Sequence, residues 1–334
     1  MSRWLRSSAL AVIVLAAATA YAADDAIVIT AVRDPVDKSY RRMVKGMDLF
    51  EEMHALAPKA SLRYKLYPRK HGTDMSGLLL HVIGERIDVP VVVAPDNTFT
   101  LVRDAKALKE DARVRSERRA ESMTWRADIR TPGLAPDTRR LGDLRLECHV
   151  GVQAGLISQY PGLMGQFLKL LQSPRDFCNR SSVPYLFFAE RPLFSVTLRS
   201  GERSQALSVG QMYAGIAHGR TPEKERRYCD CEALLDRAYI LPLGDASWPD
   251  DTLVELRYMD SAAPPADDPY AAFVGSTKAE VRAAFGDSQA LRFDSGFEVW
   301  AYDFGPPQSA LVARTELVFL FDRSGVVANT RLRP

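Results

Sequence analysis

The sequence predicts a multidomain, β-rich protein: antiparallel β-sandwich-like regions with short helices, then a C-terminal α+β module of one helix and a three-stranded antiparallel meander. Three observations lead to this prediction. Short alternating or continuously apolar segments recur between turn residues, as is typical of antiparallel sandwiches. The segment DSAAPPADDP, residues 260–269, is rich in proline, small residues and acids, and therefore marks a linker. Beyond it, a helical pattern precedes three strand patterns.

The first 22 residues have the form of a secretory signal peptide. Arg3 and Arg6 precede a continuously apolar run over residues 9–18, and AYA at residues 20–22 is a small-x-small cleavage pattern. An uncleaved anchor helix is the alternative, but a membrane span needs about 20 apolar residues. No cysteine directly follows the run to carry a lipid. We expect cleavage after residue 22, a mature chain without a stable membrane span, and a periplasmic location.

The charge of the chain is balanced. Its 44 Lys and Arg residues face 42 Asp and Glu residues, so the formal net charge is +2. The signal segment holds two arginines and no acids, and its removal brings the charge to zero. A balanced chain has no overall field that attracts nucleic acid or anionic lipid. We therefore expect no nucleic-acid partner.

Residues 23–147 are predicted to form an N-terminal β-sandwich-like domain. A helix is expected over residues 40–56, where Met, Phe and Leu recur at helical spacing and fill a core. Strands are expected in SLRYKLYP, in GLLLHVIG, and in VPVVVAPDNTFTLV, which contains two strands joined at Asp96 and Asn97. The segment MTWRADIR, residues 123–130, alternates apolar and polar side chains, which is the period of a half-buried strand.

A locally basic run lies between these strands. Arg113, Arg115, Arg118 and Arg119 could present an anion-binding face, but such runs more often form a solvated edge, which is the interpretation we favour. The later segment DIRTPGLAPDTRRLGD is rich in Pro, Gly and charge, and is expected to be an ordered loop or linker.

Residues 148–259 are predicted to form a second, disulfide-linked domain that is first helical and then β-rich. VQAGLISQYPGLMGQFLKLLQSP predicts two short helices broken at Pro161 and Gly162. Strands are expected in PYLFFAE, YILPL and DTLVELRYMD. The segment LFSVTLRSGERSQALSV predicts a hairpin that turns around Gly201.

The four cysteines of the chain, Cys148, Cys178, Cys229 and Cys231, all lie in this second domain. An even number in an exported protein predicts disulfides. Cys229 and Cys231 flank a single residue, so a bond between them would close a strained ring. We expect each to pair with Cys148 or Cys178, in an order that the sequence leaves open. A zinc site of these thiolates with His149 is the alternative, but the chain lacks CxxC…CxxC spacing.

The absence of catalytic motifs predicts that the chain is not an enzyme and has no cofactor and no metal ion. None of the five histidines forms HExxH, and no glycine-rich nucleotide fingerprint follows an expected strand. His218 is the best single candidate for a catalytic base. A hydrolase assembled only in the folded chain is the rival hypothesis, with His218 or His149 beside a carboxylate and a serine.

Residues 270–334 are predicted to form the α+β module. Thr277 and Glu280 have the spacing of a capping box, and Gly286 ends the helix that they begin. The segments VWAYDF and LVFLFDRSGVVANTRL then predict three strands, the central one apolar on both faces and the last two joined at Gly325.

The order and spacing of VGSTKAEVRAAFG, VWAYDF and LVFLFDRSGVVANTRL resemble the SmpA/OmlA (BamE-like) domain family. The resemblance is confined to residues 270–334. It implies a helix-plus-meander fold that binds partner proteins and envelope components without catalysing a reaction. The chain departs from the family in lacking a lipidation cysteine and in carrying a large N-terminal region.

These observations predict an exported, non-catalytic envelope protein, a protein–protein interaction or scaffolding factor linked to outer-membrane assembly or integrity, with envelope proteins as partners. Trp300 and Tyr302 are candidate partner contacts because aromatic anchors dominate many interfaces, although they could fill the core instead. Arg331 and Arg333 are candidates because they lie near the end of the chain.

The alternative function is that of a periplasmic carbohydrate- or peptidoglycan-binding protein, in which the N-terminal sheets do the binding. Exposure of Tyr64, Tyr67 and Trp125 on one sheet face would favour it.

Overall fold

The computed structural model describes residues 35–119, 122–156, 174–179, 185–214, 234–261, 268–304 and 315–333. Within them the strands form five sheets, and the paired strands are antiparallel. This confirms the β-rich, antiparallel prediction. Residues 32–334 form one compact unit. The predicted signal peptide lies outside the described residues, and no helix among the described residues is long and apolar enough to cross a membrane.

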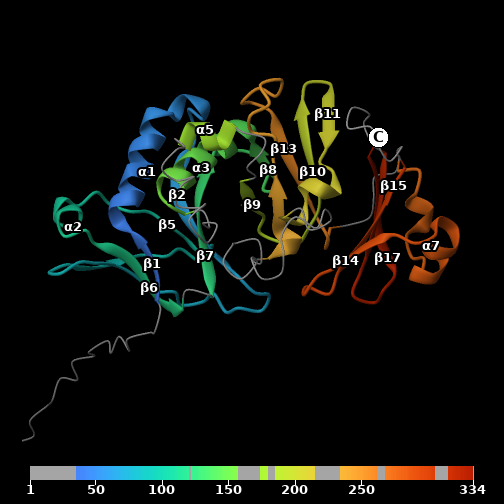
Figure 1. Ribbon diagram of the computed structural model, residues 1–334, viewed down its shortest axis with the longest axis horizontal. Coiled ribbons are helices and arrows are strands. Elements are labelled where there is room, and N and C mark those ends of the chain that lie inside the picture. The colour runs from blue at the N-terminus through green and yellow to red at the C-terminus, as the bar shows by residue number, and fades with distance from the viewer. Residues whose placement is uncertain are drawn as a thin grey trace, which may run out of the picture. The chain divides into compact units, whose positions relative to one another are not determined.

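Two sheets form an N-terminal sandwich (Figure 1). One has the strand order β1-β6-β3-β4, and the other β5-β2-β7. The strands are β1 Pro35–Ser39, β2 Ser61–Pro68, β3 Leu80–Ile83, β4 Asp88–Val91, β5 Thr98–Phe99, β6 Arg113–Arg119 and β7 Met123–Arg130. Leu80 and Val114 of the first sheet share a core with Leu66 and Trp125 of the second. The predicted sandwich-like region is therefore present.

Helix α1, Tyr40–Glu52, packs against this sandwich, and a 3-10 turn follows it at His54–Leu56. Tyr40 and Met43 belong to the same core as the two sheets, because the apolar residues recur on one face of the helix. Ser39 caps the helix by accepting a hydrogen bond from the backbone N–H of Arg42. The helix predicted over residues 40–56 is thus confirmed.

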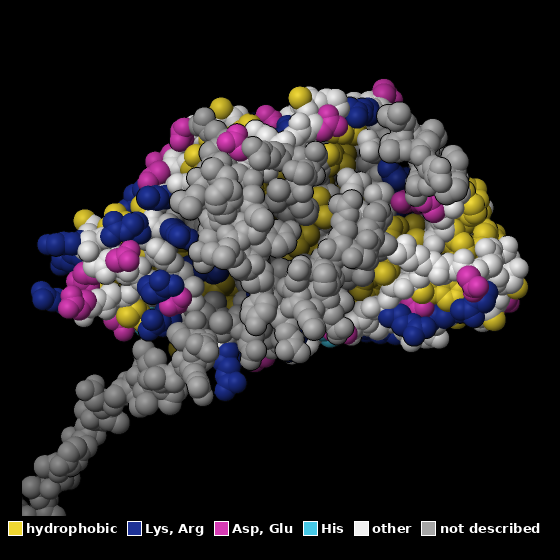
Figure 2. All heavy atoms as spheres, in the orientation of Figure 1, with side chains coloured by type: hydrophobic (Ala, Val, Ile, Leu, Met, Phe, Trp, Pro, Cys, Tyr) yellow, Lys and Arg dark blue, Asp and Glu magenta, His cyan; other side chains and the backbone are white. Residues whose placement is uncertain are grey.

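The basic run was expected to lie between strands, but part of it is itself a strand. It contains the short helix α2, Ala105–Lys109, and strand β6, an inner strand of its sheet. The outward arginines are engaged by acids: Arg113 makes hydrogen bonds to Asp37, and Arg118 pairs with Glu117. Figure 2 shows basic and acidic side chains interleaved where α2, β1 and β6 lie. This supports the solvated interpretation over an anion-binding face.

The turn predicted at Asp96 and Asn97 is present, with Asn97 at a positive φ of 62°. The two strands that flank it do not pair with each other, however. Strand β4 pairs with β3 in one sheet, whereas β5 pairs with β2 in the other. The turn therefore carries the chain from one layer of the sandwich to the other.

Helix α3, Leu141–Gln153, begins before the predicted domain boundary at residue 148 and continues through it. Leu146 and Val150 contact the N-terminal residues Ala127 and Ile129, whereas Leu144 and Cys148 belong to the core of the middle region. Because the helix has hydrophobic side chains on two sides, it packs against both predicted domains and belongs to neither alone.

A disulfide joins Cys148 of α3 to Cys178 of helix α5, Pro174–Asn179. This corrects the predicted pairing, in which each of these residues bonds to Cys229 or Cys231. Both of the latter lie outside the described residues. The prediction rested on the strain expected of a bond between Cys229 and Cys231, and close spacing gave no reason to expect a bond between the two helices.

The middle region contains a four-stranded sheet of order β11-β10-β13-β8 and a two-stranded sheet, β12-β9. The strands are β8 Thr138–Arg140, β9 Leu186–Phe188, β10 Leu193–Ser200, β11 Arg203–Ala206, β12 Ala238–Ile240 and β13 Leu253–Tyr258. The predicted hairpin is β10–β11, and Gly201 supplies its positive φ of 55°. Single 3-10 turns lie at Val209–Gln211 and Leu235–Arg237.

The C-terminal module has a 3-10 turn at Ala271–Phe273, helix α7 Lys278–Phe285, and a sheet of order β14-β15-β16-β17. Its strands are β14 Gln289–Arg292, β15 Glu298–Asp303, β16 Glu316–Phe321 and β17 Val327–Arg333. The capping box of Thr277 and Glu280 is present as predicted. The sheet has four strands rather than three, because residues 289–292 add an edge strand beside β15.

Both faces of this C-terminal sheet are buried. On one face Trp300 and Phe319 pack with Val281 of α7. On the other, Val299 and Leu320 belong to the core of the middle region. The alternation of β16 thus places its apolar side chains in two different cores. The predicted linker falls mostly on residues 262–267, outside the described residues.

The folded protein is expected to lose stability in acid because of Glu298. Burial of this carboxyl favours its neutral form, but hydrogen bonds from Lys278 and Trp300 outweigh burial and lower the pKa of Glu298 below its usual 4.5. A lowered folded-state pKa stabilises the fold above the unfolded pKa, and this contribution disappears as pH falls through the folded value. We expect Glu298→Gln to flatten the stability profile below about pH 4.5, measured by thermal unfolding between pH 7 and pH 3. Glu255→Gln, at a half-exposed position, is the control, and equal profiles for both variants would contradict this role.

A charged depression beside the N-terminal sheet

The second face of the β5-β2-β7 sheet is polar and largely buried. On β7, Trp125 and Ile129 point into the hydrophobic core, so Arg126 and Asp128 point to the opposite face. Strand register pairs Arg63 of β2 with Asp128, and Lys65 with Arg126. Lys65, Arg126 and Asp128 are all buried. Buried charges require partners, and segments from the middle region supply several of them.

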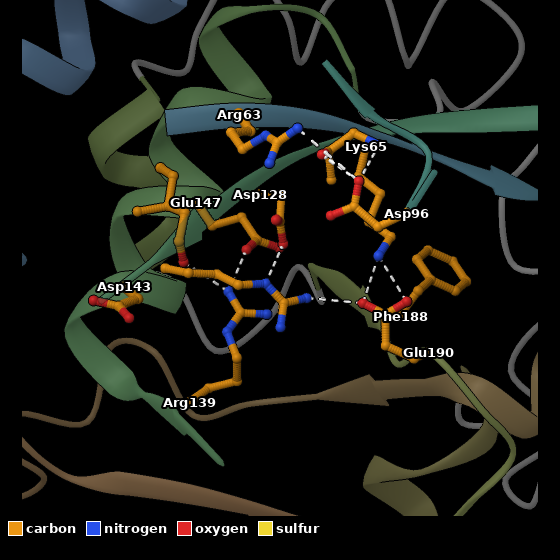
Figure 3. Close-up of polar contacts among 12 residues, drawn as sticks. Arg63, Lys65, Asp96, Asp128, Arg139, Asp143, Glu147, Phe188 and Glu190 are labelled. Carbon is orange, nitrogen blue, oxygen red and sulfur yellow. Dashed lines mark hydrogen bonds and ion pairs between the residues drawn. The ribbon is translucent and has the colours of Figure 1, made fainter. Parts of the chain in front are cut away.

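A connected set of ion pairs covers this polar face (Figure 3). Lys65 Nζ donates to both carboxylate oxygens of Glu190, at 2.6 and 2.7 Å. Arg130 Nη2 donates to Glu190 Oε1 at 2.9 Å, and its Nε donates to Asp128 Oδ1 at 2.8 Å. Glu190 follows β9 and thus joins the middle region to the N-terminal sheet. Charge-assisted hydrogen bonds of this length are the stronger kind in proteins.

A second ion pair, Arg139–Glu147, lies deeper in the protein. Arg139 Nη2 donates to Glu147 Oε2 and to the carbonyl of Ile129, both at 2.8 Å. Burial raises the pKa of Glu147 and the charge of Arg139 opposes that rise. Burial alone would lower the pKa of Arg139, but Glu147 and Asp128 raise it above its usual value. Both effects reflect two charges held close together away from water.

An open depression of about 520 Å³ adjoins this network. Its lining contains three basic and three acidic side chains, together with polar or small residues: Arg63, Lys65, Arg130, Asp96, Asp128, Glu190, Ser61, Asn97 and Pro132. The basic and acidic groups come from β2, β7, the turn before β5 and the segment after β9. The depression therefore presents charges of both signs.

Arg63 and Asp96 form the loosest ion pair in the lining. Arg63 Nη2 lies 4.0 Å from Asp96 Oδ1, and the two side chains are 38% and 57% exposed. Asp96 Oδ1 accepts hydrogen bonds from the backbone N–H and the hydroxyl of Thr98, at 3.1 and 2.6 Å. Partial burial opposes ionisation, but the Thr98 hydrogen bonds and the charge of Arg63 lower the pKa of Asp96. Asp96 is therefore held as a carboxylate beside a guanidinium that it contacts only weakly.

The four predicted partner contacts are all internal. Trp300 and Tyr302 are 2% and 6% exposed and pack under α7, which is the core alternative considered above. Arg331 is 8% exposed and donates to the carbonyl of Leu207, and Arg333 donates to that of Ala206. These arginines attach β17 to the end of β11. The expectation that they are exposed at the end of the chain is thereby corrected.

The structure also shows where most of the residues named for the rival functions lie. Tyr64, Tyr67 and Trp125 are buried, so an exposed aromatic sheet face is not present at these positions. His149 is buried in α3, and its neighbour Cys148 is in a disulfide and so is not a thiolate ligand. His218 lies outside the described residues. Among the described residues, no group of three or more His, Cys, Asp or Glu side chains could hold a metal ion.

The charged depression was not predicted from the sequence, although one signal was present. SLRYKLYP and MTWRADIR both alternate, and their second faces carry Arg63, Lys65, Arg126, Asp128 and Arg130. Opposite charges on two neighbouring strands indicate a face that is paired rather than merely solvated. Comparisons of the chain with protein-family models, with curated proteins and with solved structures found no match.

Proposed function

We propose that this chain is an exported, non-catalytic envelope protein that binds another envelope protein, in a scaffolding role linked to outer-membrane assembly or integrity. The observation that carries the proposal is the order of elements in residues 277–333: a capped helix, then antiparallel strands β15, β16 and β17. That order supports the resemblance to the SmpA/OmlA family, whose members bind partner proteins. The signal-type N-terminus supports export.

Because Trp300, Tyr302 and Arg331 are buried and Arg333 is bound to the carbonyl of Ala206, we propose a partner surface on this module that uses other residues. Val274, before α7, is 40% exposed, and Phe304, after β15, is 52% exposed. On the face shown in Figure 2, hydrophobic side chains gather near the position of α7. Val274 precedes the residues that contact the start of β17, and Phe304 follows the far end of β15, so each would contact a partner at its own position. Exposed apolar side chains can serve as such contacts. We propose Val274 and Phe304 as contacts.

Crosslinking in intact cells tests this proposal. The full-length chain, the double variant Val274→Ser/Phe304→Ser and the control Val92→Ser are expressed at equal levels, and crosslinked proteins are recovered and identified. Val92 is 87% exposed and lies in the N-terminal region, so it matches the chemistry of the change at a distant site. Removing two apolar contacts is expected to lower recovery of an envelope partner by about tenfold or more, with no loss in the control. Equal recovery with all three chains would overturn the proposal.

The second candidate function, binding of a carbohydrate or peptidoglycan component, is favoured by a different observation. The charged depression, and not an aromatic surface, is the feature of the N-terminal region that could hold such a ligand. Its chemistry restricts the class of ligand, independently of the partner surface.

A further inference from the structure

The lining of the depression disfavours ligands whose charges are all positive or all negative. Arg63, Lys65 and Arg130 would repel a cation, whereas Asp96, Asp128 and Glu190 would repel an anion. Among the described residues of the lining, Pro132 alone lacks a polar side chain. An apolar ligand would therefore cover charged groups without replacing the hydrogen bonds that they make with water. The ligand that fits this lining carries both charges on one small polar body.

The six charged groups are not equally available. Lys65 and Arg130 are hydrogen-bonded to Glu190 and Asp128, and these bonds hold the floor of the depression in place. Arg63, in contrast, has its nearest acid at 4.0 Å, beyond hydrogen-bond distance. Among the described basic residues of the lining, Arg63 is therefore the one whose guanidinium has the most donors available to a ligand. Asp96, fixed by Thr98 through Oδ1, is the most exposed of the three acids, at 57% against 42% for Glu190 and 8% for Asp128.

We infer that the depression binds a small zwitterion, a free amino acid or a free dipeptide, with its carboxylate on Arg63 and its ammonium group on Asp96. Such a ligand replaces one long ion pair with two hydrogen-bonded ones. A guanidinium can bind a carboxylate through two parallel hydrogen bonds, which gives orientation as well as affinity. The Lys65–Glu190–Arg130 network need not open, so the site is preformed.

Titration calorimetry on the purified chain from residue 23 tests the inference with three matched probes. L-Alanyl-L-alanine carries both charges, its N-acetyl form only the carboxylate, and its amide only the ammonium group. Each capped form loses one charge-assisted pair and is expected to bind about tenfold or more weakly than the free dipeptide. An absence of binding by the free dipeptide at millimolar concentration, or equal binding of a capped form, would overturn the inference.

Variants locate the binding. Arg63→Gln and Asp96→Asn each remove one charge from a half-exposed side chain, so the fold is expected to remain, as circular dichroism will check. Each is expected to weaken dipeptide binding about tenfold. Arg199→Gln is the matched control, because Arg199 is 50% exposed and pairs with Glu255 on the surface of another sheet. If both folded variants bind like the control, the dipeptide is not held by Arg63 and Asp96. The assay contains no partner protein, so its result is separate from that of the crosslinking experiment.

Discussion

Removal of residues 260–334 is expected to destabilise the rest of the chain, although these residues resemble an independent module. Phe297, Val299, Val318 and Leu320 of the C-terminal sheet belong to the core that also contains Leu207 and Val209. Burial of each such side chain contributes about 1.5–3 kcal/mol. Loss of all four therefore removes roughly 6 kcal/mol or more, which is comparable with the stability of a whole domain.

Polar interactions across the same boundary add to this effect. Arg331 and Arg333 donate to backbone carbonyls at the end of β11, and Glu316 accepts from the backbone N–H of Val209. After truncation the backbone groups of the middle region must be hydrated, and the apolar residues beside them are exposed to water. The truncated chain is expected to unfold at lower temperature and urea concentration, and to aggregate more readily.

Urea unfolding followed by tryptophan fluorescence measures the effect, since Trp125 and Trp248 are buried and remain after truncation. The point variant Leu320→Ala is a milder form of the same change and is expected to destabilise by about 2–5 kcal/mol. Phe304→Ser, at an exposed position of the module, is the control and should leave the midpoint unchanged. If the truncated chain unfolds at the same midpoint as the full chain, the shared core contributes nothing. In that case residues 270–334 form an independent domain.

The contrast between local and long-range contacts explains what the sequence could predict. The α7 cap depends on residues three positions apart, and the β10–β11 turn on two residues, so both were predictable from short segments. Arg331 looks exposed in the sequence because it lies near the end of the chain. Its partner, the carbonyl of Leu207, is 124 positions away, and no local pattern indicates this contact.

In the candidate site, too, local patterns could be predicted and long-range contacts could not. Alternation in MTWRADIR predicts which residues of β7 face the core, and the structure agrees for Met123 and Trp125. Alternation cannot show what covers the other face. Lys65 and its partner Glu190 are 125 positions apart, in segments assigned to different domains by their composition. The depression therefore appears only when the two segments are brought together.

Glu147→Leu is expected to destabilise the protein far more than a change at any exposed ion pair. Arg139 and Glu147 have side chains only 6% and 7% exposed, and they pair at 2.8 Å. Removing the acid leaves a buried guanidinium without its main counter-charge, and breaking a buried pair in this way destabilises by about 3–5 kcal/mol. The matched surface change, Glu255→Leu, breaks a half-exposed pair with Arg199 and is expected to change stability by about 1 kcal/mol or less. Urea midpoints measure both.

The double variant Arg139→Met/Glu147→Leu distinguishes attraction between the two charges from the unfavourable burial of each. The raised pKa of Glu147 indicates that burial disfavours its charge even with Arg139 beside it. Replacing both groups with apolar side chains removes this disadvantage, so the double variant is expected to recover most of the stability that the single change loses. Asp128, whose charge also acts on Arg139, remains paired with Arg130. A double variant no more stable than Glu147→Leu alone would show instead that α3 needs this ion pair to stay in contact with β8.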